Sequence, residues 1–152
     1  MPTVRYSAVS RAPASALWAR LADLDSWPRW LRAPYADQSV TLTAAPSAHQ
    51  GAEFVMKGRL PYRLFARITD WQPERGIEFE IHRSEYPSDR FTFGRARIAI
   101  RLERLPDGRT RVTCEHRLCG RGLLGRLYGA TVMRPFLKSN VRRIVGGLIG
   151  SE

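Results

Sequence analysis

The sequence predicts an α+β domain in which a curved antiparallel sheet of seven strands wraps around one long C-terminal helix. From about Val40 to Leu118 the chain reads as one strand after another, and Leu123 to Ile149 then forms a single amphipathic stretch. A helix of roughly 26 residues is about 39 Å long, so we expect it to lie along the sheet. A sheet and a helix packed in this way enclose space, and enclosed space is where small apolar ligands bind.

Length and composition indicate one globular domain over residues 1–152. A chain of 152 residues is long enough for one core, and its hydrophobic share of 43% is too high for disorder. No apolar run reaches the ~18 residues that a membrane-spanning helix needs. Residues 1–6 also lack the apolar core of a signal peptide. We therefore expect a cytoplasmic protein.

The cysteines and histidines give no sign of a metal site or a cofactor. Cys114 and Cys119 lie in one predicted strand, so their side chains would be about 17 Å apart on opposite faces. They cannot form a disulfide bond with each other, and reduced thiols suit a cytosolic protein. His49, His82 and His116 share no ligand spacing, so we predict neither metal nor cofactor.

The net charge of +11 is compatible with anionic partners such as nucleic acid or anionic lipid. The excess is almost all arginine, with Lys57 and Lys138 as the lysines, and the arginines are scattered along the chain. Nucleic-acid binders concentrate charge on one face. The scatter therefore argues against a nucleic-acid partner.

The elements before the main run of strands are indicated by alternation and by prolines. Thr3 to Ser10 alternates and predicts a first strand. Ala14 to Leu24 has apolar residues at helical spacing and predicts a short helix. Asp25 to Leu31 predicts a second short helix, with Pro28 near its start and Pro34 beyond its end.

Six further strands are predicted from alternating apolar and polar residues. We expect them over Gln38–Thr43, Ala52–Gly58, Tyr62–Trp71, Ile77–Arg83, Phe91–Leu105 and Arg109–Cys119. The strand from Phe91 changes phase at Gly94, which predicts a bulge. Residues 106–108, Pro-Asp-Gly, predict the last hairpin turn.

One face of the predicted C-terminal helix is apolar except for an amide. That face carries Met133, Leu137, Asn140, Val141, Ile144 and Leu148. Arg126 breaks the register before Met133, and Pro135 predicts a kink. The amide of Asn140 needs a hydrogen bond if it is buried. Either it caps the gap left at the Pro135 kink, or it points into a cavity at a ligand.

Residues 120–125 match the glycine pattern G-x-G-x-x-G and lie between a predicted strand and a predicted helix. This pattern marks a dinucleotide site when a second parallel strand and an acidic ribose ligand follow. Neither follows here, since the only acid downstream is Glu152. We interpret the glycines as residues that loosen a strand-to-helix turn.

His116 faces the predicted core beside Cys114. It can be interpreted as a general base or ligand anchor, or as a core histidine that donates to a carbonyl. The alternation places no Asp or Glu beside it, and a nucleophilic Cys114 would need a lowered pKa. A structural or ligand-positioning role is therefore favoured over catalysis.

Three stretches of the chain together point to a family. Asp25 to Trp30 is a short helix bearing two tryptophans, Ala66 to Phe79 is a hairpin, and Leu123 to Ile149 is the terminal helix. In this order they resemble elements of the START-like, helix-grip superfamily, often labelled polyketide cyclase/dehydrase and lipid transport. The resemblance covers nearly the whole chain and implies the helix-grip fold. It implies no catalytic residue, because members bind unrelated ligands and many are not enzymes.

We therefore predict binding, with transport as an extension, of a hydrophobic or aromatic small molecule such as a lipid or polyketide in an internal cavity. The expected apolar walls are Phe54, Met56, Phe79, Ile81, Met133 and Leu137. His116 and Asn140 are the expected polar anchors, and Tyr35, which follows Pro34, is expected at the cavity mouth. On this interpretation the protein is not an enzyme.

Two alternatives stay open. The protein could be a polyketide cyclase or dehydratase with His116 as base, while Tyr35 or an inward arginine polarises a carbonyl. The candidate arginines are Arg95 and Arg97. It could instead be a basic-surface module for RNA or an anionic membrane, touched transiently, and its binding would then fall steeply with salt. Replacing His116 by alanine separates the enzyme from a simple binder, because turnover would collapse while binding survived.

Overall fold

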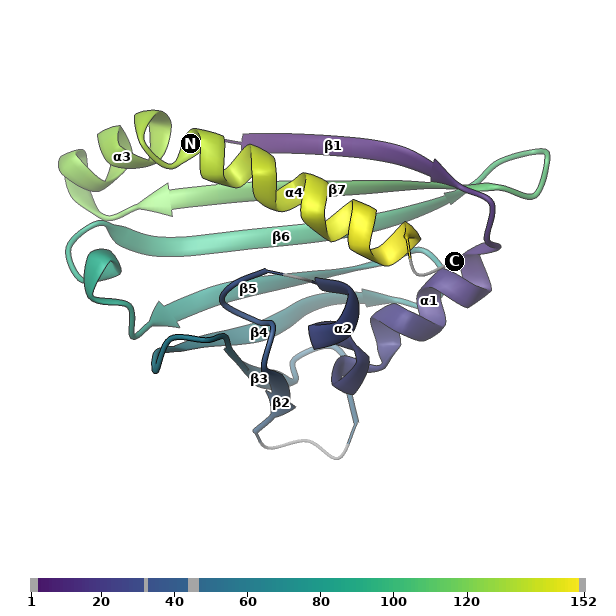
Figure 1. Cartoon of the computed structure of the whole chain (residues 1–152), viewed down its shortest axis with the longest axis horizontal. Coiled ribbons are helices and arrows are strands. Elements are labelled where there is room, and N and C mark those ends of the chain that lie inside the picture. Colours follow the sequence, from purple (N-terminus) through teal and green to yellow (C-terminus); the bar gives the residue numbers. More distant parts are fainter. Residues whose placement is uncertain (1–2, 32, 44–46, 151–152) are drawn as a thin grey trace.

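The computed structural model of the protein describes residues 3–31, 33–43 and 47–150. The chain begins with a strand, passes through short helices and further strands, and ends in two helices (Figure 1). The elements are β1 (Thr3–Ser10), α1 (Ala14–Ala22), η1 (Leu24–Ser26), α2 (Trp27–Leu31), β2 (Ser39–Leu42), β3 (Glu53–Lys57), β4 (Arg63–Gln72), β5 (Gly76–Ser84), η2 (Pro87–Asp89), β6 (Phe93–Arg104), β7 (Thr110–Gly120), α3 (Gly122–Thr131) and α4 (Arg134–Ile149).

The strands form one seven-stranded sheet in the order β1-β7-β6-β5-β4-β3-β2. Every neighbouring pair is antiparallel. Figure 1 shows α4 crossing one face of this sheet, with α1 near the C-terminal end of α4 and α3 beyond its N-terminal end. The predicted α+β helix-grip architecture is therefore confirmed.

The core lies between the inward face of the sheet and the helices. On β5 the inward residues Ile77, Phe79 and Ile81 are buried, and Glu78 and Glu80 alternate with them on the other face. Fully burying an apolar side chain of this size stabilises the fold by about 1.5–3 kcal/mol. The alternation therefore fixes the register, because a shift by one residue would turn the whole apolar set outward.

The outer face of the sheet is polar and carries ion pairs between neighbouring strands. Arg97 lies 3.0 Å from Glu80, and Arg95 lies 3.8 Å from the same carboxylate. Both arginine side chains are more than half exposed. The alternative in which Arg95 or Arg97 points inward is therefore wrong, because the alternation on β6 turns Ala96 and Ile98 to the core instead.

The predicted single helix from Leu123 to Ile149 is two helices in the structure. α3 ends where the N–H groups of Val132 and Met133 both donate to the carbonyl of Tyr128, at 2.9 and 3.1 Å. Pro135 lies in the first turn of α4, where its missing N–H leaves no helical bond unmade. The proline therefore begins a new helix, and α4 alone is about 24 Å long. No helix in the described ranges is long and apolar enough to cross a bilayer.

The glycines of residues 120–125 build the tight connection between β7 and α3. Gly122 has a φ of 64°, a conformation that residues with a side chain rarely adopt. A Cβ on Gly120 would lie 2.1 Å from the carbonyl oxygen of Gly125. The pattern therefore serves a close chain reversal at the end of an antiparallel sheet, which is not the setting of a dinucleotide site.

Smaller features agree with the sequence or differ from it by a few residues. The bulge predicted at Gly94 is confirmed by a register shift between Phe93 and Arg95. The first predicted helix ends at Ala22 instead of Leu24, and the second is divided into η1 and α2. The strand and helix order is unchanged by these differences.

Candidate functional site

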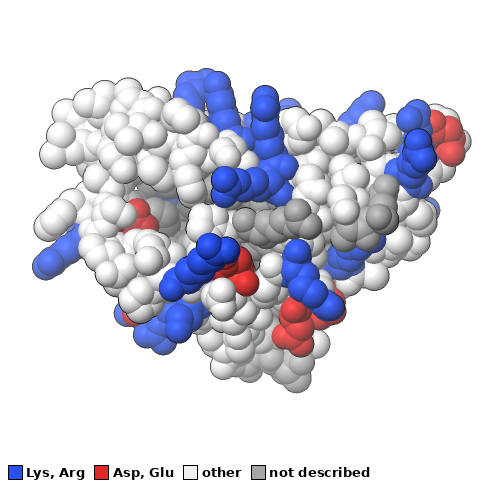
Figure 2. Space-filling view, viewed as in Figure 1, with Lys and Arg blue, Asp and Glu red and all other residues white. Residues whose placement is uncertain are grey.

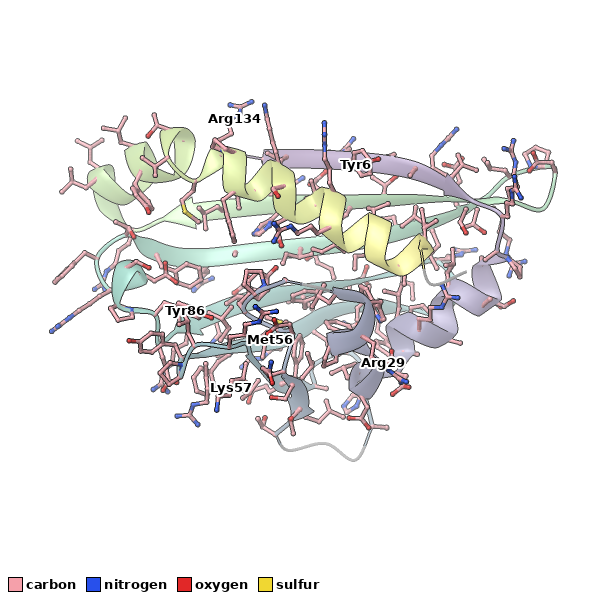
Figure 3. All side chains as sticks on the ribbon, viewed as in Figure 1. Tyr6, Arg29, Met56, Lys57, Tyr86 and Arg134 are labelled. Carbon is pink, nitrogen blue, oxygen red and sulfur yellow. The ribbon has the colours of Figure 1, made fainter. Side chains whose placement is uncertain are left out.

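A cavity of about 560 Å³ lies between the sheet and the helices, at the end of the molecule nearer α3. Small-molecule sites usually have volumes of this order. Figure 3 shows Tyr86, one of its rim residues, at that end of the sheet. The lining residues are Pro34, Tyr35, Arg59, Leu60, Leu64, Ile81, Tyr86, Ser88, Asp89, Phe93, Ala96, His116, Leu118, Tyr128, Met133, Phe136 and Leu137.

Three buried polar side chains are linked at the wall of this cavity. The Tyr35 hydroxyl donates to Oδ1 of Asn140 at 2.9 Å. Nδ2 of Asn140 lies 3.2 Å from Nδ1 of His116, and all three residues are at most 9% exposed. The side-chain amide of Asn140 therefore bonds to two other side chains, whereas the sequence analysis expected it to cap the helix at the Pro135 kink or to bind a ligand. It joins the segment after α2 to strand β7 through α4.

The linked side chains fix the tautomer of His116. Because Oδ1 of Asn140 accepts from Tyr35, the amide presents its NH₂ group to the imidazole. Nδ1 must then accept, and the ring proton lies on Nε2. His116 lines the cavity, and no described residue bonds to its Nε2. The Nε2–H group is thus left as a donor for an acceptor atom of a ligand.

Burial keeps this polar group uncharged. Desolvation lowers the pKa of His116 to about 4, so the imidazole is neutral at pH 7. Desolvation also raises the pKa of the Tyr35 hydroxyl far above its usual range, against the opposing hydrogen bond to Asn140. At His116, an apolar ligand would therefore meet a hydrogen-bond donor that carries no charge.

One carboxyl group reaches the cavity rim from a loop in which sequence analysis placed no site residue. Asp89, at the end of η2, lines the cavity and accepts a hydrogen bond from the Ser84 hydroxyl at 2.6 Å. Partial burial raises the pKa of this carboxyl. The loop has no periodic pattern, so the chain carried no signal that Asp89 would face the cavity.

An aromatic cluster closes off the space beside the cavity. The Trp27 ring lies 5.5 Å from that of Phe54 and 5.3 Å from that of Phe79, between centroids. Met56 is fully buried in the same core, and Figure 3 shows it over the strands, to the left of α2. The expected wall residues Phe54, Met56 and Phe79 therefore do not line the cavity, because they pack against Trp27 and fill the space under α2.

The other expected site residues lie around the cavity or directly behind its wall. Those that line it are Tyr35, Ile81, His116, Met133 and Leu137. Sequence analysis missed Leu64, Ala96 and Leu118, although all three lie on the inward register of their strands. It also missed Tyr128 and Phe136, whose positions depend on the break between α3 and α4.

The cysteines show no feature of a nucleophile or of a disulfide. Both are free thiols. Cys114 is fully buried, and desolvation raises the pKa of its thiol, which disfavours the reactive thiolate. Within the part of the chain that the structure describes, no three His, Cys, Asp or Glu side chains gather where they could hold a metal ion.

Solved structures share this architecture at low sequence identity. A protein of Nitrosospira multiformis superimposes with a TM-score of 0.76 at 14% identity, covering 99% of this chain and 95% of that one. The Zhui aromatase/cyclase of a Streptomyces species gives 0.73 at 18% identity, with 99% and 92% covered. The di-domain aromatase/cyclase BexL gives 0.75 at 14% identity, with 99% of this chain but 46% of that chain covered. At such identities the likeness establishes the fold alone.

Sequence comparison gives the family. No curated protein matches the sequence. Residues 1–149, nearly the whole chain, match the family described as polyketide cyclase / dehydrase and lipid transport. That span takes in every strand, every helix and the whole cavity wall. The chain therefore belongs to the polyketide cyclase/dehydrase and lipid transport family.

Proposed function

We propose that the protein binds a hydrophobic or aromatic small molecule bearing a hydrogen-bond acceptor, such as the carbonyl of a polyketide or the carboxyl of a lipid. One observation carries the proposal: the neutral imidazole of His116 lines an apolar cavity of about 560 Å³ and keeps its Nε2–H unused by the protein. The apolar walls would supply affinity, and the N–H group would orient the ligand.

The relatives support this ligand class. The family description names polyketide cyclases, dehydrases and lipid transport, and Zhui and BexL are described as aromatase/cyclases. Polyketides and lipids both combine a large apolar body with a few oxygen acceptors. The free thiols of Cys114 and Cys119 support the cytoplasmic location expected from the sequence.

A matched pair of probes tests the proposal. Acetylnaphthalene and ethylnaphthalene have nearly the same shape, and only the first has a carbonyl oxygen. We expect wild-type protein to bind the ketone about three- to tenfold more tightly, as one added hydrogen bond predicts. Isothermal titration calorimetry or quenching of probe fluorescence measures both affinities.

The control is the same pair of probes with His116→Ala. This variant should bind both probes with similar affinity, because the walls remain and the N–H group is gone. A wild-type protein that binds neither probe would contradict the proposal. So would a preference for the ketone that survives in His116→Ala.

A second candidate function is cyclisation or dehydration of a polyketide-like substrate. Asp89 favours it, because a partly buried carboxyl with a raised pKa lies at the rim of the same cavity. A carboxylate in this place can accept a proton from a substrate carbon and return it, while the Nε2–H of His116 polarises a carbonyl. In this version Asp89 is the base and His116 is not, because the hydrogen bond from Asn140 occupies Nδ1 and the tautomer inferred from it places the ring proton on Nε2.

Mass spectrometry of a linear poly-β-ketone thioester separates the two functions. A cyclase would convert it to an isomer of the same mass that separates from it by liquid chromatography, and a dehydratase would convert it to a product lacking one water. Asp89→Asn and His116→Ala would each lower the rate by at least about a hundredfold. A pure binding protein would retain the thioester unchanged. Binding of the probe pair by Asp89→Asn shows whether the cavity is intact in the variant.

A further inference from the structure

Helix α3 turns its three leucines away from the protein. Leu123 is 82% exposed, Leu124 is 78% exposed and Leu127 is 61% exposed. The residues that α3 buries are Gly125 and Gly129. α3 therefore contacts the sheet through glycines and presents its leucines to the surroundings, which is the reverse of a helix that stabilises a core.

Neighbouring residues extend this surface. Phe91 is 76% exposed and Val132 is 61% exposed. The Phe91 loop lies against the start of α3, because the N–H of Arg121 donates to the carbonyl of Thr92 at 2.9 Å. We call Phe91, Leu123, Leu124, Leu127 and Val132 the apolar tip. Figure 2 shows a broad uncharged surface over α3 at the upper left.

The apolar tip adjoins the mouth of the cavity. Tyr128 of α3 lines the cavity, as do Met133 and Phe136 directly after it. Phe136 is also 40% exposed. A ligand that leaves or enters between α3 and the η2 loop therefore passes the exposed leucines.

Four arginines lie around the apolar tip without acidic partners, and Asp89 is the carboxylate nearest to them in the sequence. Arg90, Arg121, Arg126 and Arg134 form no ion pair with any described residue. From Arg121 to Gly150 the sequence contains no Asp or Glu at all. The arginines of the sheet differ, since most of them pair with a carboxylate on a neighbouring strand or turn, as Arg97 does with Glu80.

We propose that the apolar tip docks the protein on an anionic lipid bilayer. Exposed aliphatic side chains on a short helix would enter the interface between head groups and acyl chains, and the surrounding arginines would meet the acidic head groups. A second copy of this chain fits less well, because two tips facing each other would bring unpaired arginines together. Docking would place the cavity mouth at the source or destination of an apolar ligand.

Flotation with vesicles of phosphatidylcholine and phosphatidylglycerol tests the docking surface. We expect wild-type protein to float with these vesicles, to bind vesicles of phosphatidylcholine alone far less, and to lose binding as salt rises. The double variant Leu123→Ser/Leu127→Ser should bind roughly tenfold or more weakly. Both leucines are exposed, so far-UV circular dichroism and the thermal midpoint should match those of wild type.

Two charge variants make the test specific to this surface. Arg126→Gln should weaken vesicle binding about fivefold. Arg29→Gln removes the same charge on α2, away from α3 (Figure 3), and should leave binding within about twofold of wild type.

Three results would overturn the proposal. One is equal binding by wild type and the double serine variant. Another is equal weakening by Arg126→Gln and Arg29→Gln, which would indicate attraction by net charge alone. The third is a dimer, seen by light scattering, that the double serine variant abolishes, because it would assign the apolar tip to a second copy. None of these measurements depends on the ligand of the cavity.

Discussion

The space between the sheet and the helices has two ends that differ in how they are filled. At the packed end, Trp27 of α2 packs against Phe54 and Phe79, and all three side chains are almost fully buried. At the open end, α3 turns its leucines outward, and the inward side chains of the strands border a cavity instead of a helix. Phe79 and Ile81 are successive inward residues of β5, yet they lie at different ends. What the helix contributes, and not the strand, decides whether the space is closed.

This difference separates stability from binding. The packed end contributes dispersion and burial that hold the fold together. The open end has apolar walls whose burial is incomplete until a ligand arrives. Substitutions at the packed end should therefore change the free energy of unfolding, and substitutions at the open end should change ligand affinity.

The largest expected loss of stability comes from substituting Trp27 at the packed end. Trp27→Ala should lower the free energy of unfolding by about 3–5 kcal/mol, because it leaves a large cavity. It also removes the donor of a 3.0 Å hydrogen bond to the carbonyl of Leu21. Phe136→Ala at the open end is the matched control and should cost less than about 1 kcal/mol, since Phe136 is already 40% exposed. Urea denaturation measures both, and equal losses would contradict the division into two ends.

Asn140 should affect both stability and ligand binding. Its side chain is buried, and it bonds to Tyr35 and His116, which line the cavity. Asn140→Ala should lower the free energy of unfolding by about 2–3 kcal/mol, since it leaves the Tyr35 hydroxyl and Nδ1 of His116 without partners. It should also reduce the preference for acetylnaphthalene, because the imidazole can then take either tautomer. Lys138→Ala on the exposed side of the same helix should change neither quantity. Unchanged probe preference in Asn140→Ala would show that the amide does not fix the tautomer.

The free energy of unfolding should fall in acid, because His116 is buried in its neutral form. The pKa of His116 is about 4 in the folded protein, below the ordinary histidine value of 6.5, so the unfolded chain binds a proton first as the pH falls. Stability present above pH 6.5 is therefore lost between pH 6.5 and 4, at up to about 1.4 kcal/mol per pH unit. The slope should be shallower in His116→Ala over that window, as measured by urea denaturation at several pH values. Identical slopes would mean that His116 titrates normally in the folded protein.

The smallest expected change in stability comes from filling the open end. Ala96 is buried and lines the cavity, so Ala96→Leu should project into empty space. We expect stability within about 1 kcal/mol of wild type and probe affinity at least about tenfold lower. Ala66→Leu is the contrasting variant, because Ala66 is buried on β4 without lining the cavity and overpacking there should destabilise the fold. Similar losses of stability in the two variants would argue against an open end.

The strands could be predicted well from the sequence, because alternation reports directly which face of a sheet is buried. Each of the seven predicted strands is present with bounds that differ by two residues at most. The packed and open ends could not be told apart in this way, since Phe79 and Ile81 are equally apolar and equally inward. The distinction depends on where α2 and α3 dock, which is a property of the tertiary structure.

The polar parts of the site were predicted only in part for a similar reason. His116 and Asn140 were identified because each interrupts an apolar face. The hydrogen bonds from Asn140 to His116 and to Tyr35 needed the relative positions of α4, β7 and the segment after α2, which no local pattern encodes. Asp89 was missed because loops have no period, and the break before α4 was missed because Pro135 is compatible with either a kink or a helix start.

Methyl NMR spectroscopy tests the central claim most directly, by titrating the protein with acetylnaphthalene and following its Ile, Leu and Met methyl groups. The two-ended description predicts that signals of Ile81, Leu118 and Leu137, which line the cavity, shift on binding. Signals of Met56 and Ile68, which are buried without lining it, should stay in place. Shifts confined to Met56 and Ile68, or no shift at saturating probe, would contradict the account.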